Sequence, residues 1–448
     1  MSFLFYLYLA VALVIGCLCA RRIHTPDDYY VAGRRADVLH LTGSLLATIL
    51  GSSAILGSID MGYAKGWAGV WLMLCGAIGL LALFPLVNII SRFRGYNLSM
   101  LLGTFYGDRV KKLSGAVIAV AWLGVIGAQL IGAAKITASM FGIPYALGVV
   151  AIGLTLTFYT TVGGQFSIIR TDVLQALLIF LGLVPVSIIL FLRSPSLNAT
   201  PPISSAFTSF DLTAMLFAYS TTFLVGPDIY SRLFCAKDKS TAKKAVLTTA
   251  LVLVPLAFLL AFIGIYGART HAGDNGSILF AIASNEFPPA VTLLLYFALL
   301  SAIMSSADTT LFTAGGLLSQ FFHEQMDSRE SVRLTRVCTA ALGLLAIVIA
   351  ISFQSLLTVL LFALGIYAGA FVVPVLWGLL GFSSRRSHAL AAILTGGALA
   401  LAGKIMGGNA GNTLVIVAFL VNFGLLWLGR IPDGQQASSK TRGEGQKY

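Results

Sequence analysis

Five hydroxyl groups and one carboxyl group stand inside an apolar stretch of the chain. The sequence SAIMSSADTT, residues 301–310, follows an apolar run that begins near Val291, and apolar residues resume at Leu311. Hydrocarbon offers no hydrogen-bond partners, and a carboxylate at the centre of a membrane span costs roughly 2.5–3.5 kcal/mol on insertion scales. Polar groups in such a place normally face a cavity or a partner, so this segment is expected to carry the function.

The spacing within the segment points to a cation. Ala302, Ser305, Ser306 and Thr309 recur at intervals of three and four, which puts them on one helical face. Hard cations prefer oxygen ligands, and we extend that preference to sodium. The expected donors are the hydroxyls of Ser305 and Ser306 and the backbone carbonyls of Ala302, Ala47 and Leu50. Serine and threonine hydroxyls can also bond to carbonyls of their own helix. However, so many hydroxyls opposite Ala47 and Leu50, where the second apolar span is interrupted, favour a site for a co-transported sodium ion.

The composition of the chain indicates which class of protein contains this polar segment. The 448-residue chain is 58% hydrophobic and only 10% charged, and its mean hydropathy is +0.91, as in a polytopic membrane protein. Apolar stretches long enough to span a bilayer are centred near residues 12, 50, 79, 123, 154, 181, 221, 256, 305, 343, 366, 396 and 420. An all-α fold with about thirteen transmembrane helices is expected, because the alternating pattern of a membrane barrel is absent.

The basic residues predict the orientation of these helices. Of the 29 lysines and arginines, 24 fall in segments that alternate helices would place on one side of the membrane. The positive-inside rule then puts the N-terminus outside and the C-terminus in the cytoplasm, in the plasma or inner membrane. The net charge of +12 therefore requires no nucleic-acid partner. The lipid bilayer and a small-molecule solute are the expected partners, and nothing in the sequence indicates an obligatory protein partner.

Two spans contain helix breakers in corresponding places. The second span, residues 45–57, contains Gly51 followed by two serines, and the seventh, residues 219–228, contains Gly226 and Pro227. Counting five helices from each broken span gives two units. Because five is odd, the second unit starts on the opposite side of the membrane and is inverted relative to the first, as in transporters with inverted repeats. The prediction is a single membrane transport domain over residues 1–448. Its expected parts are a first helix at about 3–20, repeats at about 39–193 and 210–379, two helices at about 388–429 and a cytoplasmic tail at 430–448.

Six motifs in a fixed order resemble the sodium/solute symporter family, which includes relatives of proline, pantothenate, sialic acid and sodium/glucose transporters. They are DDYYVAGRR at 27–35, SLLA at 44–47, GYAKG at 62–66, one motif in two parts (YTTVGG with RTDVLQ, between 159 and 175), PDIYSRLFCAK at 227–237, and the SAIMSS segment. The resemblance implies the leucine-transporter-like fold, two inverted five-helix repeats with one helix before them and two after. It also places Ala47, Leu50, Ala302, Ser305 and Ser306 on the family's shared sodium site.

The resemblance further implies a second cation site, at which this chain departs from the family pattern. Asp172 matches an aspartate that some members use for sodium, but Asp308 and Thr309 stand where a serine pair is usual. Two neighbouring carboxylates either share a cation or share a proton, because like charges oppose each other in a site of low dielectric constant. A second sodium or partial proton coupling is therefore expected at Asp172, Asp308 and Thr309. The alternative is that Asp308 caps nearby backbone amides.

The solute is expected between the second, third, seventh and eleventh spans. The expected lining residues are Ser52, Ser53, Ala54, Tyr219, Phe223, Gly226 and Tyr367. Family members that bind sugars carry Glu, Gln and Asn near the two breaks, whereas this chain has Ser53, Ala54 and Gly226 there. A cavity with few donors suits an amino acid or a monocarboxylate better than a sugar, held by helix N-terminal amides and hydroxyls.

The function expected is thus a sodium-coupled importer that works by alternating access. An enzyme is not expected, because no nucleophile is paired with a base and the five histidines lack metal-ligand spacing. The alternative is a passive channel or uniporter for a small solute. Arg34 and Arg232 are read first as cytoplasmic anchors and second as parts of an inner gate, and Asp228 as a helix-end or gate residue.

Overall fold

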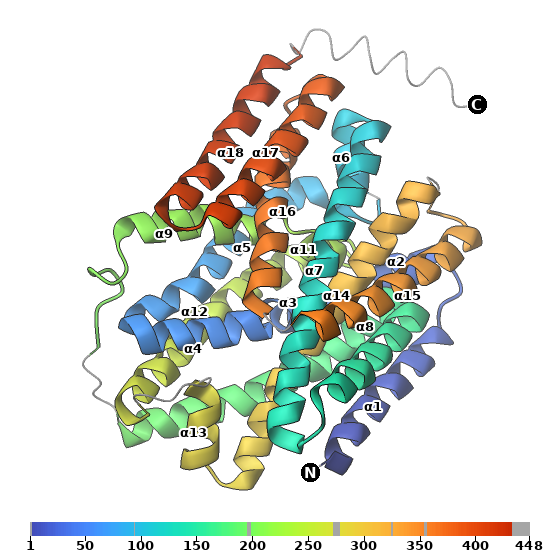
Figure 1. Cartoon of the computed structure of the whole chain (residues 1–448). Helices are drawn as coiled ribbons and strands as arrows, with labels where there is room; N and C mark the ends of the chain where they lie inside the picture. Colours follow the sequence, from blue (N-terminus) through green and yellow to red (C-terminus); the bar gives the residue numbers. More distant parts are fainter. Residues whose placement is uncertain are drawn as a thin grey trace.

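The computed structural model describes residues 2–93, 95–194, 199–271, 278–323, 326–353 and 356–431, and these ranges are helical almost throughout (Figure 1). Within them there are three isolated bridges but no strand. From residue 432 onward, the predicted cytoplasmic tail lies outside the described residues. The helices are α1 (Ser2–Ala20), α2 (Pro26–Val31), η1 (Ala32–Arg34), α3 (Val38–Ile49), α4 (Ser52–Lys65), η2 (Gly66–Gly69), α5 (Val70–Ile90), α6 (Leu98–Tyr106), α7 (Asp108–Phe141), α8 (Tyr145–Arg193), α9 (Ser209–Met215), η3 (Leu216–Ser220), α10 (Thr221–Val225), α11 (Pro227–Leu233), α12 (Lys239–Thr270), α13 (Ile278–Glu286), α14 (Pro289–Phe322), α15 (Arg329–Ser352), α16 (Leu356–Leu379), α17 (Arg386–Met406) and α18 (Gly408–Leu428).

The predicted spans correspond to these helices. All thirteen predicted centres lie in a helix of the described residues or, for residue 50, at the junction of α3 and α4. By length and hydropathy, eight stretches of the described residues are able to cross a bilayer, and three further apolar helices are shorter. The fifth and sixth predicted spans are both parts of the 49-residue α8, in which Gly164 (φ 52°, ψ −154°) interrupts the helical geometry between them.

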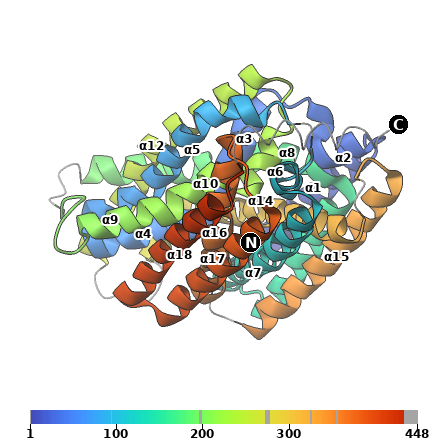
Figure 2. The same ribbon diagram turned by 90° about the horizontal axis from the view of Figure 1, so that it is seen from above.

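The helix α14, which carries the polar segment, runs through the centre of the molecule. It packs against α7 and α8 over most of its length and also touches α3, α11 and α15 (Figures 1 and 2). Every residue from 298 to 317 is buried. The carboxyl and hydroxyl groups of this segment therefore face other helices and not the hydrocarbon, as the cost of burying them in lipid requires.

Peripheral helices surround this centre. α1 lies along α8, and α17 and α18 form a hairpin that packs on α16 (Figure 1). α4 and α12 approach each other closely at two glycines: a Cβ on Gly62 would lie 2.5 Å from the Ala261 carbonyl oxygen, and one on Gly264 would lie 2.0 Å from the Ile59 carbonyl oxygen. Small residues permit such close helix packing in membranes. The contact fixes α4, and with it the position of the break where α4 begins.

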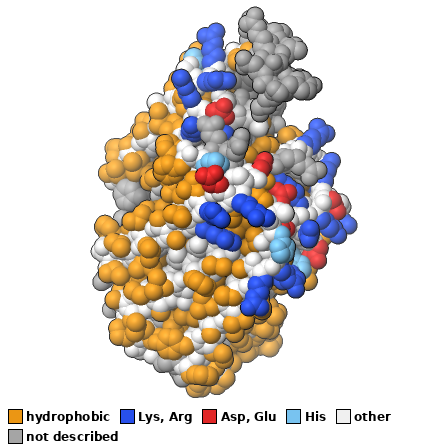
Figure 3. Space-filling model, turned by 90° about the vertical axis from the view of Figure 1, so that its right-hand side faces the viewer, with side chains coloured by type: hydrophobic (Ala, Val, Ile, Leu, Met, Phe, Trp, Pro, Cys, Tyr) orange, Lys and Arg blue, Asp and Glu red, His pale blue; other side chains and the backbone are white. Residues whose placement is uncertain are grey.

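The outer surface is that of an integral membrane protein. Large apolar side chains such as Val120, Val337 and Leu192 are more than 60% exposed, and many more are exposed on α1, α8 and α15. On the face in Figure 3 they form a broad apolar area, whereas lysines and arginines gather toward one end. Water-soluble monomers rarely expose apolar patches larger than a few hundred Å². The surface therefore fits a bilayer, with the basic groups at its boundary.

Candidate functional site

The predicted break in the second span lies between α3 and α4. Asp37 caps the start of α3, and hydrogen bonds from the backbone amide and ring of His40 lower the pKa of the Asp37 carboxyl. At the other end Leu50 (φ −78°, ψ 39°) and Gly51 (φ −60°, ψ 162°) leave helical geometry, and α4 starts at Ser52. Such a break frees backbone carbonyls inside the membrane, which is the arrangement that cation sites in transporters use.

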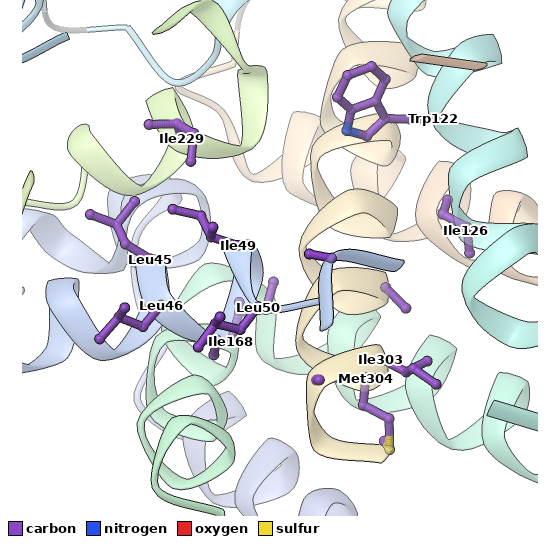
Figure 4. Packing of buried hydrophobic residues seen from close by; sticks show 14 of the residues in the cluster. Leu45, Leu46, Ile49, Leu50, Trp122, Ile126, Ile168, Ile229, Ile303 and Met304 are labelled. Atoms are coloured by element: carbon purple, nitrogen blue, oxygen red, sulfur yellow. The ribbon is translucent and has the colours of Figure 1, made fainter. Parts of the chain in front are cut away.

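α14 meets α3 at this break. The Ser306 hydroxyl donates to the Thr48 carbonyl oxygen over 3.0 Å. A Cβ on Gly51 would lie 2.6 Å from the Ser306 Oγ, so a side chain at residue 51 would displace the Ser306 hydroxyl. The side chains of Leu45, Leu46, Ile49 and Leu50 pack with Ile168 of α8 and Ile229 of α11, and apolar contacts therefore hold α3 in place (Figure 4).

The predicted sodium donors are only partly brought together. Ala47, Leu50 and Ala302 are completely buried, α3 and α14 contact each other, and Ser306 contacts the break directly. The Ser305 hydroxyl instead donates to Oδ1 of Asp172, a residue of α8. Ser305 thus links the break to the predicted second site, a connection that the spacing within α14 did not reveal.

A buried ion pair occupies the region of Asp172. The Arg232 guanidinium, on α11, lies 3.0 Å from Asp172 Oδ2, and both side chains have zero exposure. Ser44 donates to the same carboxylate oxygen, and Arg232 also donates to the Ser44 carbonyl oxygen over 3.3 Å and to the Thr309 hydroxyl. The interpretation of Arg232 as a cytoplasmic anchor is therefore wrong, because its charge is neutralised inside the protein and does not reach lipid headgroups.

Asp308 has other partners than Asp172. Its Oδ2 accepts a hydrogen bond of 2.7 Å from the Tyr159 hydroxyl of α8, and its Oδ1 accepts one of 3.2 Å from Thr309. Thr309 contacts both Asp308 and Arg232, so it links the two carboxylates, through Arg232, into one network. One helical turn before Ser305, the Ser301 hydroxyl lies 3.1 Å from the Tyr8 hydroxyl of α1. The polar groups of the segment 301–310 thus have partners on four other helices, α1, α3, α8 and α11.

The predicted break in the seventh span is also present. α10 ends at Val225, Gly226 adopts an extended conformation (φ −63°, ψ 129°), and Pro227 opens α11. The hydroxyl groups of Tyr367 and Tyr230 donate to the freed carbonyls of Val225 and Leu224, respectively. Immediately before α10, residues 216–220 form a π-helix, η3, which the sequence did not indicate. Single-turn π-helices occur frequently at functional sites.

A cavity of about 410 Å³ lies between the two breaks. Six of the predicted solute residues line it: Ser53, Ala54, Tyr219, Phe223, Gly226 and Tyr367. The seventh, Ser52, begins α4, and its side chain lies outside the described residues. Ser306 and Thr48 belong to the lining as well, so the wall of the cavity is also the wall of the predicted sodium site.

Sequence reasoning did not place several of the polar and aromatic lining residues in the cavity, among them a tryptophan, a glutamine and an aspartate. Trp122 and Gln129, seven positions apart on α7, and Asp228 on α11 all face the cavity. The Trp122 ring nitrogen donates to Asp228 Oδ1 over 2.8 Å. The seven-residue spacing of Trp122 and Gln129 was a usable signal, since it puts both on one helical face. Asp228 was noticed, but its place next to the break suggested a capping or gating role.

The chain is similar to known transporters over most of its length. The sodium:solute symporter family model matches residues 29–396. The osmoregulated proline transporter of Bacillus subtilis (strain 168) is 23% identical over 428 residues, 88% of this chain and 87% of that protein. The sodium/pantothenate symporter of Escherichia coli (strain K12) is 24% identical over 429 residues, 88% of each chain. A solved structure, the substrate-bound outward-open state of a Na⁺-coupled sialic acid symporter, superposes with a TM-score of 0.81 at 18% identity, covering 94% of this chain and 95% of that one. This confirms the predicted leucine-transporter-like fold.

Proposed function

This chain belongs to the sodium:solute symporter family, and from that membership and the geometry of the site we propose that it is a sodium-coupled secondary active importer of a small organic solute. The single observation that carries the proposal is the hydrogen bond from Ser306 to the Thr48 carbonyl, at a helix break that also lines the cavity. An ion bound there would stabilise the same wall that the solute contacts. Binding of one would then favour binding of the other, as coupling requires.

The proposed sodium ligands are the carbonyl oxygens of Ala47, Leu50 and Ala302 and the hydroxyls of Ser305 and Ser306. Supporting this set, the three carbonyl residues are buried, the helices α3 and α14 are in contact, and Ser306 already reaches a carbonyl of the break. Ser305 donates to Asp172, and it would turn an oxygen lone pair toward sodium without giving up that bond. The ion would thereby be connected to the Asp172–Arg232 pair.

Alternating access needs a gate on each side of the cavity, and we assign the inner gate to the chain segments before α3 and after α11. Ala36 and residues 235–237 form a parallel bridge in which the Ala36 amide donates to Cys235 over 3.0 Å and the Lys237 amide donates to Ala36 over 3.1 Å. Arg34 adds a bond to the Phe234 carbonyl over 3.2 Å. With the N-terminus outside and the C-terminus in the cytoplasm, as the basic residues predict, this contact would close the cavity toward the cytoplasm.

The solute is proposed to be an amino acid or a monocarboxylate and not a sugar. The hydroxyls of Ser306, Thr222 and Thr310 line the cavity, but each donates to a backbone carbonyl. Few donors therefore remain for a polyol, whose every hydroxyl must find a partner when it leaves water. A compact solute with one or two charged groups needs fewer partners.

Sodium-dependent stabilisation of the purified protein tests the proposal. We expect sodium chloride to raise the melting temperature relative to potassium chloride, because an ion that binds only the native state stabilises it. Ser306→Ala removes one oxygen ligand and should raise the half-saturating sodium concentration at least tenfold, equivalent to about 1.4 kcal/mol. Ser187→Ala is the matched control, since the Ser187 hydroxyl is buried but bonds only to Leu183 of its own helix.

A passive channel or uniporter gives the opposite result. It predicts equal melting temperatures in sodium and potassium, and no difference between Ser306→Ala and the Ser187→Ala control. In proteoliposomes it also predicts solute flux that a sodium gradient does not accelerate.

A further inference from the structure

We propose that the transported solute carries a positively charged nitrogen, which binds against the Asp228 carboxylate and the aromatic rings of the cavity. This inference rests on the proposed transport function and narrows its solute class. Among the described residues that line the cavity, Asp228 is the only charged one, and no lysine, arginine or histidine is present. A bound solute therefore meets a net negative wall.

The side chain of Asp228 forms no ion pair among the described residues. Trp122 donates to its Oδ1 over 2.8 Å, and no basic nitrogen forms an ion pair with it. The nearest guanidinium, that of Arg232, points elsewhere: its Nη1 donates to the backbone carbonyl of Asp228 over 3.2 Å, and its Nη2 lies 3.0 Å from Asp172. Removing a carboxylate from water is expensive unless a counter-charge is supplied, so closure of the cavity calls for a cation on the solute.

The remaining walls suit a cation that is poorly hydrated. Four aromatic residues line the cavity in two edge-to-face pairs: Trp122 with Tyr367, whose ring centroids are 4.8 Å apart, and Tyr219 with Phe223, at 5.1 Å. The face of an aromatic ring attracts an ammonium group, and assemblies of such rings bind quaternary ammonium ions in other proteins. The hydroxyl of Tyr367 is occupied by the Val225 carbonyl. This tyrosine therefore offers its ring, not a hydrogen bond.

A hydrogen bond holds the Asp228 carboxylate beside the Trp122–Tyr367 pair. Trp122 belongs to one of the pairs and donates to Asp228 through its ring nitrogen, so the indole orients the carboxylate while its own ring faces Tyr367. A volume of about 410 Å³ lies within the range of about 300–1,000 Å³ that is usual for small-molecule sites. Of the two solute classes proposed above, a simple monocarboxylate would bring a second negative charge to Asp228. An amino acid or another amine brings the complementary charge.

Probes of equal shape and different charge test this inference. Binding to the full-length protein in sodium chloride is measured calorimetrically for choline, its neutral isostere 3,3-dimethylbutan-1-ol, and the anion 3,3-dimethylbutanoate. A second set, butylammonium, butan-1-ol and butanoate, covers primary amines. We expect the cation of at least one set to bind at least tenfold more tightly than the neutral and anionic members.

Variants identify the group responsible. Asp228→Asn keeps the shape of the side chain and should reduce the preference for the cation at least tenfold. Asp60→Asn, which removes the same charge from an exposed site on α4 outside the cavity, should leave the preference unchanged. Stabilisation of Asp228→Asn by sodium alone shows that this variant is folded.

The inference is overturned if neither set favours its cation, if the anions bind best, or if Asp228→Asn keeps the wild-type preference. Stabilisation by sodium distinguishes these outcomes from failure of the transport proposal. If sodium stabilises the wild type and the probes contradict the charge order, only the solute class is wrong. If sodium has no effect, the coupling itself is wrong.

Discussion

Two buried carboxylates of the polar centre differ in how their charge is balanced. Asp172 is paired with Arg232 and accepts bonds from Ser44 and Ser305, whereas Asp308 accepts bonds only from the neutral hydroxyls of Tyr159 and Thr309. A carboxylate at this depth needs a cation or a proton. We therefore expect Asp308 to bind the second cation of the transport cycle, because Arg232 already neutralises the charge of Asp172.

Asp308→Ser, which restores the usual serine, tests this expectation. Protonation of Asp308 would remove the negative charge that attracts the cation. The half-saturating sodium concentration of the wild type should therefore rise when the pH is lowered from about 8 to about 6, and the rise should be smaller in Asp308→Ser. It is measured by thermal-shift titration, with Asp308→Asn as a control of nearly equal size. Equal pH dependence in all three proteins would remove Asp308 from ion coupling and leave it as a structural acceptor for Tyr159 and Thr309.

Local sequence signals predicted some of these residues, and long-range pairing hid the others. The hydroxyl spacing on α14 and the glycine at residue 51 are local, and Ser306 indeed meets the break there. The pairs Arg232–Asp172 and Trp122–Asp228 join residues 60 and 106 positions apart. No periodicity within one helix encodes such a pair, so the charge balance of the centre and of the cavity became visible only in the fold.

At the scale of elements, the kink in α8 determines where Asp172 lies. Gly164 adopts φ 52° and ψ −154°, a region essentially reserved for glycine, and a Cβ there would lie 2.7 Å from the Tyr29 carbonyl oxygen. Asp172 follows the kink by about two turns, and Tyr159 precedes it by more than one. The kink thus sets the position of Asp172, which pairs with Arg232, relative to Tyr159, which donates to Asp308.

Gly164→Ala should lower the free energy of unfolding by about 1–3 kcal/mol from backbone strain alone, and the contact with Tyr29 adds to this. We expect a lower melting temperature and weaker stabilisation by sodium. Gly316→Ala is the matched control, because Gly316 lies inside the helix α14 and a Cβ there would meet nothing within 4 Å. Alanine favours a helix over glycine. A Gly164→Ala protein as stable as the Gly316→Ala control would contradict the assigned role of the kink.

Helix breaks marked by glycine and proline were predictable from the sequence, whereas the π-helix was not. Gly51 and Gly226–Pro227 interrupt their spans where expected. Residues 216–220, LFAYS, contain neither glycine nor proline, and nothing local distinguishes them from an α-helix. The boundaries of the two five-helix repeats stay a prediction. The close approach of α5 to η3, where a Cβ on Gly79 would lie 2.2 Å from the Ser220 carbonyl oxygen, is a tertiary constraint at the π-helix.

At the scale of the whole molecule, the bilayer explains why so much of the fold could be predicted from the sequence. Its thickness sets the length of each span, and the thirteen predicted centres therefore coincide with helices or with the break at residue 50. The bilayer does not decide which helix occupies the centre. That α14 is buried from residue 298 to 317, while α17 and α18 form a peripheral hairpin, follows from packing among distant segments.

The bridge between Ala36 and residues 235–237 has a consequence for isotope exchange. Its two amide protons are protected only while the inner gate is closed, since both bonds join segments that must separate for inward release. Hydrogen–deuterium exchange of peptides containing Ala36 and Lys237 should therefore be slower in sodium than in potassium chloride. The amide of Thr241, in the first turn of α12, donates to the capping residue Asp238 and should exchange equally in both. Equal exchange at the bridge in both salts would contradict the assignment of the gate. Slower exchange in sodium would make the exchange rate of these two amides a measure of how often the protein opens toward the cytoplasm.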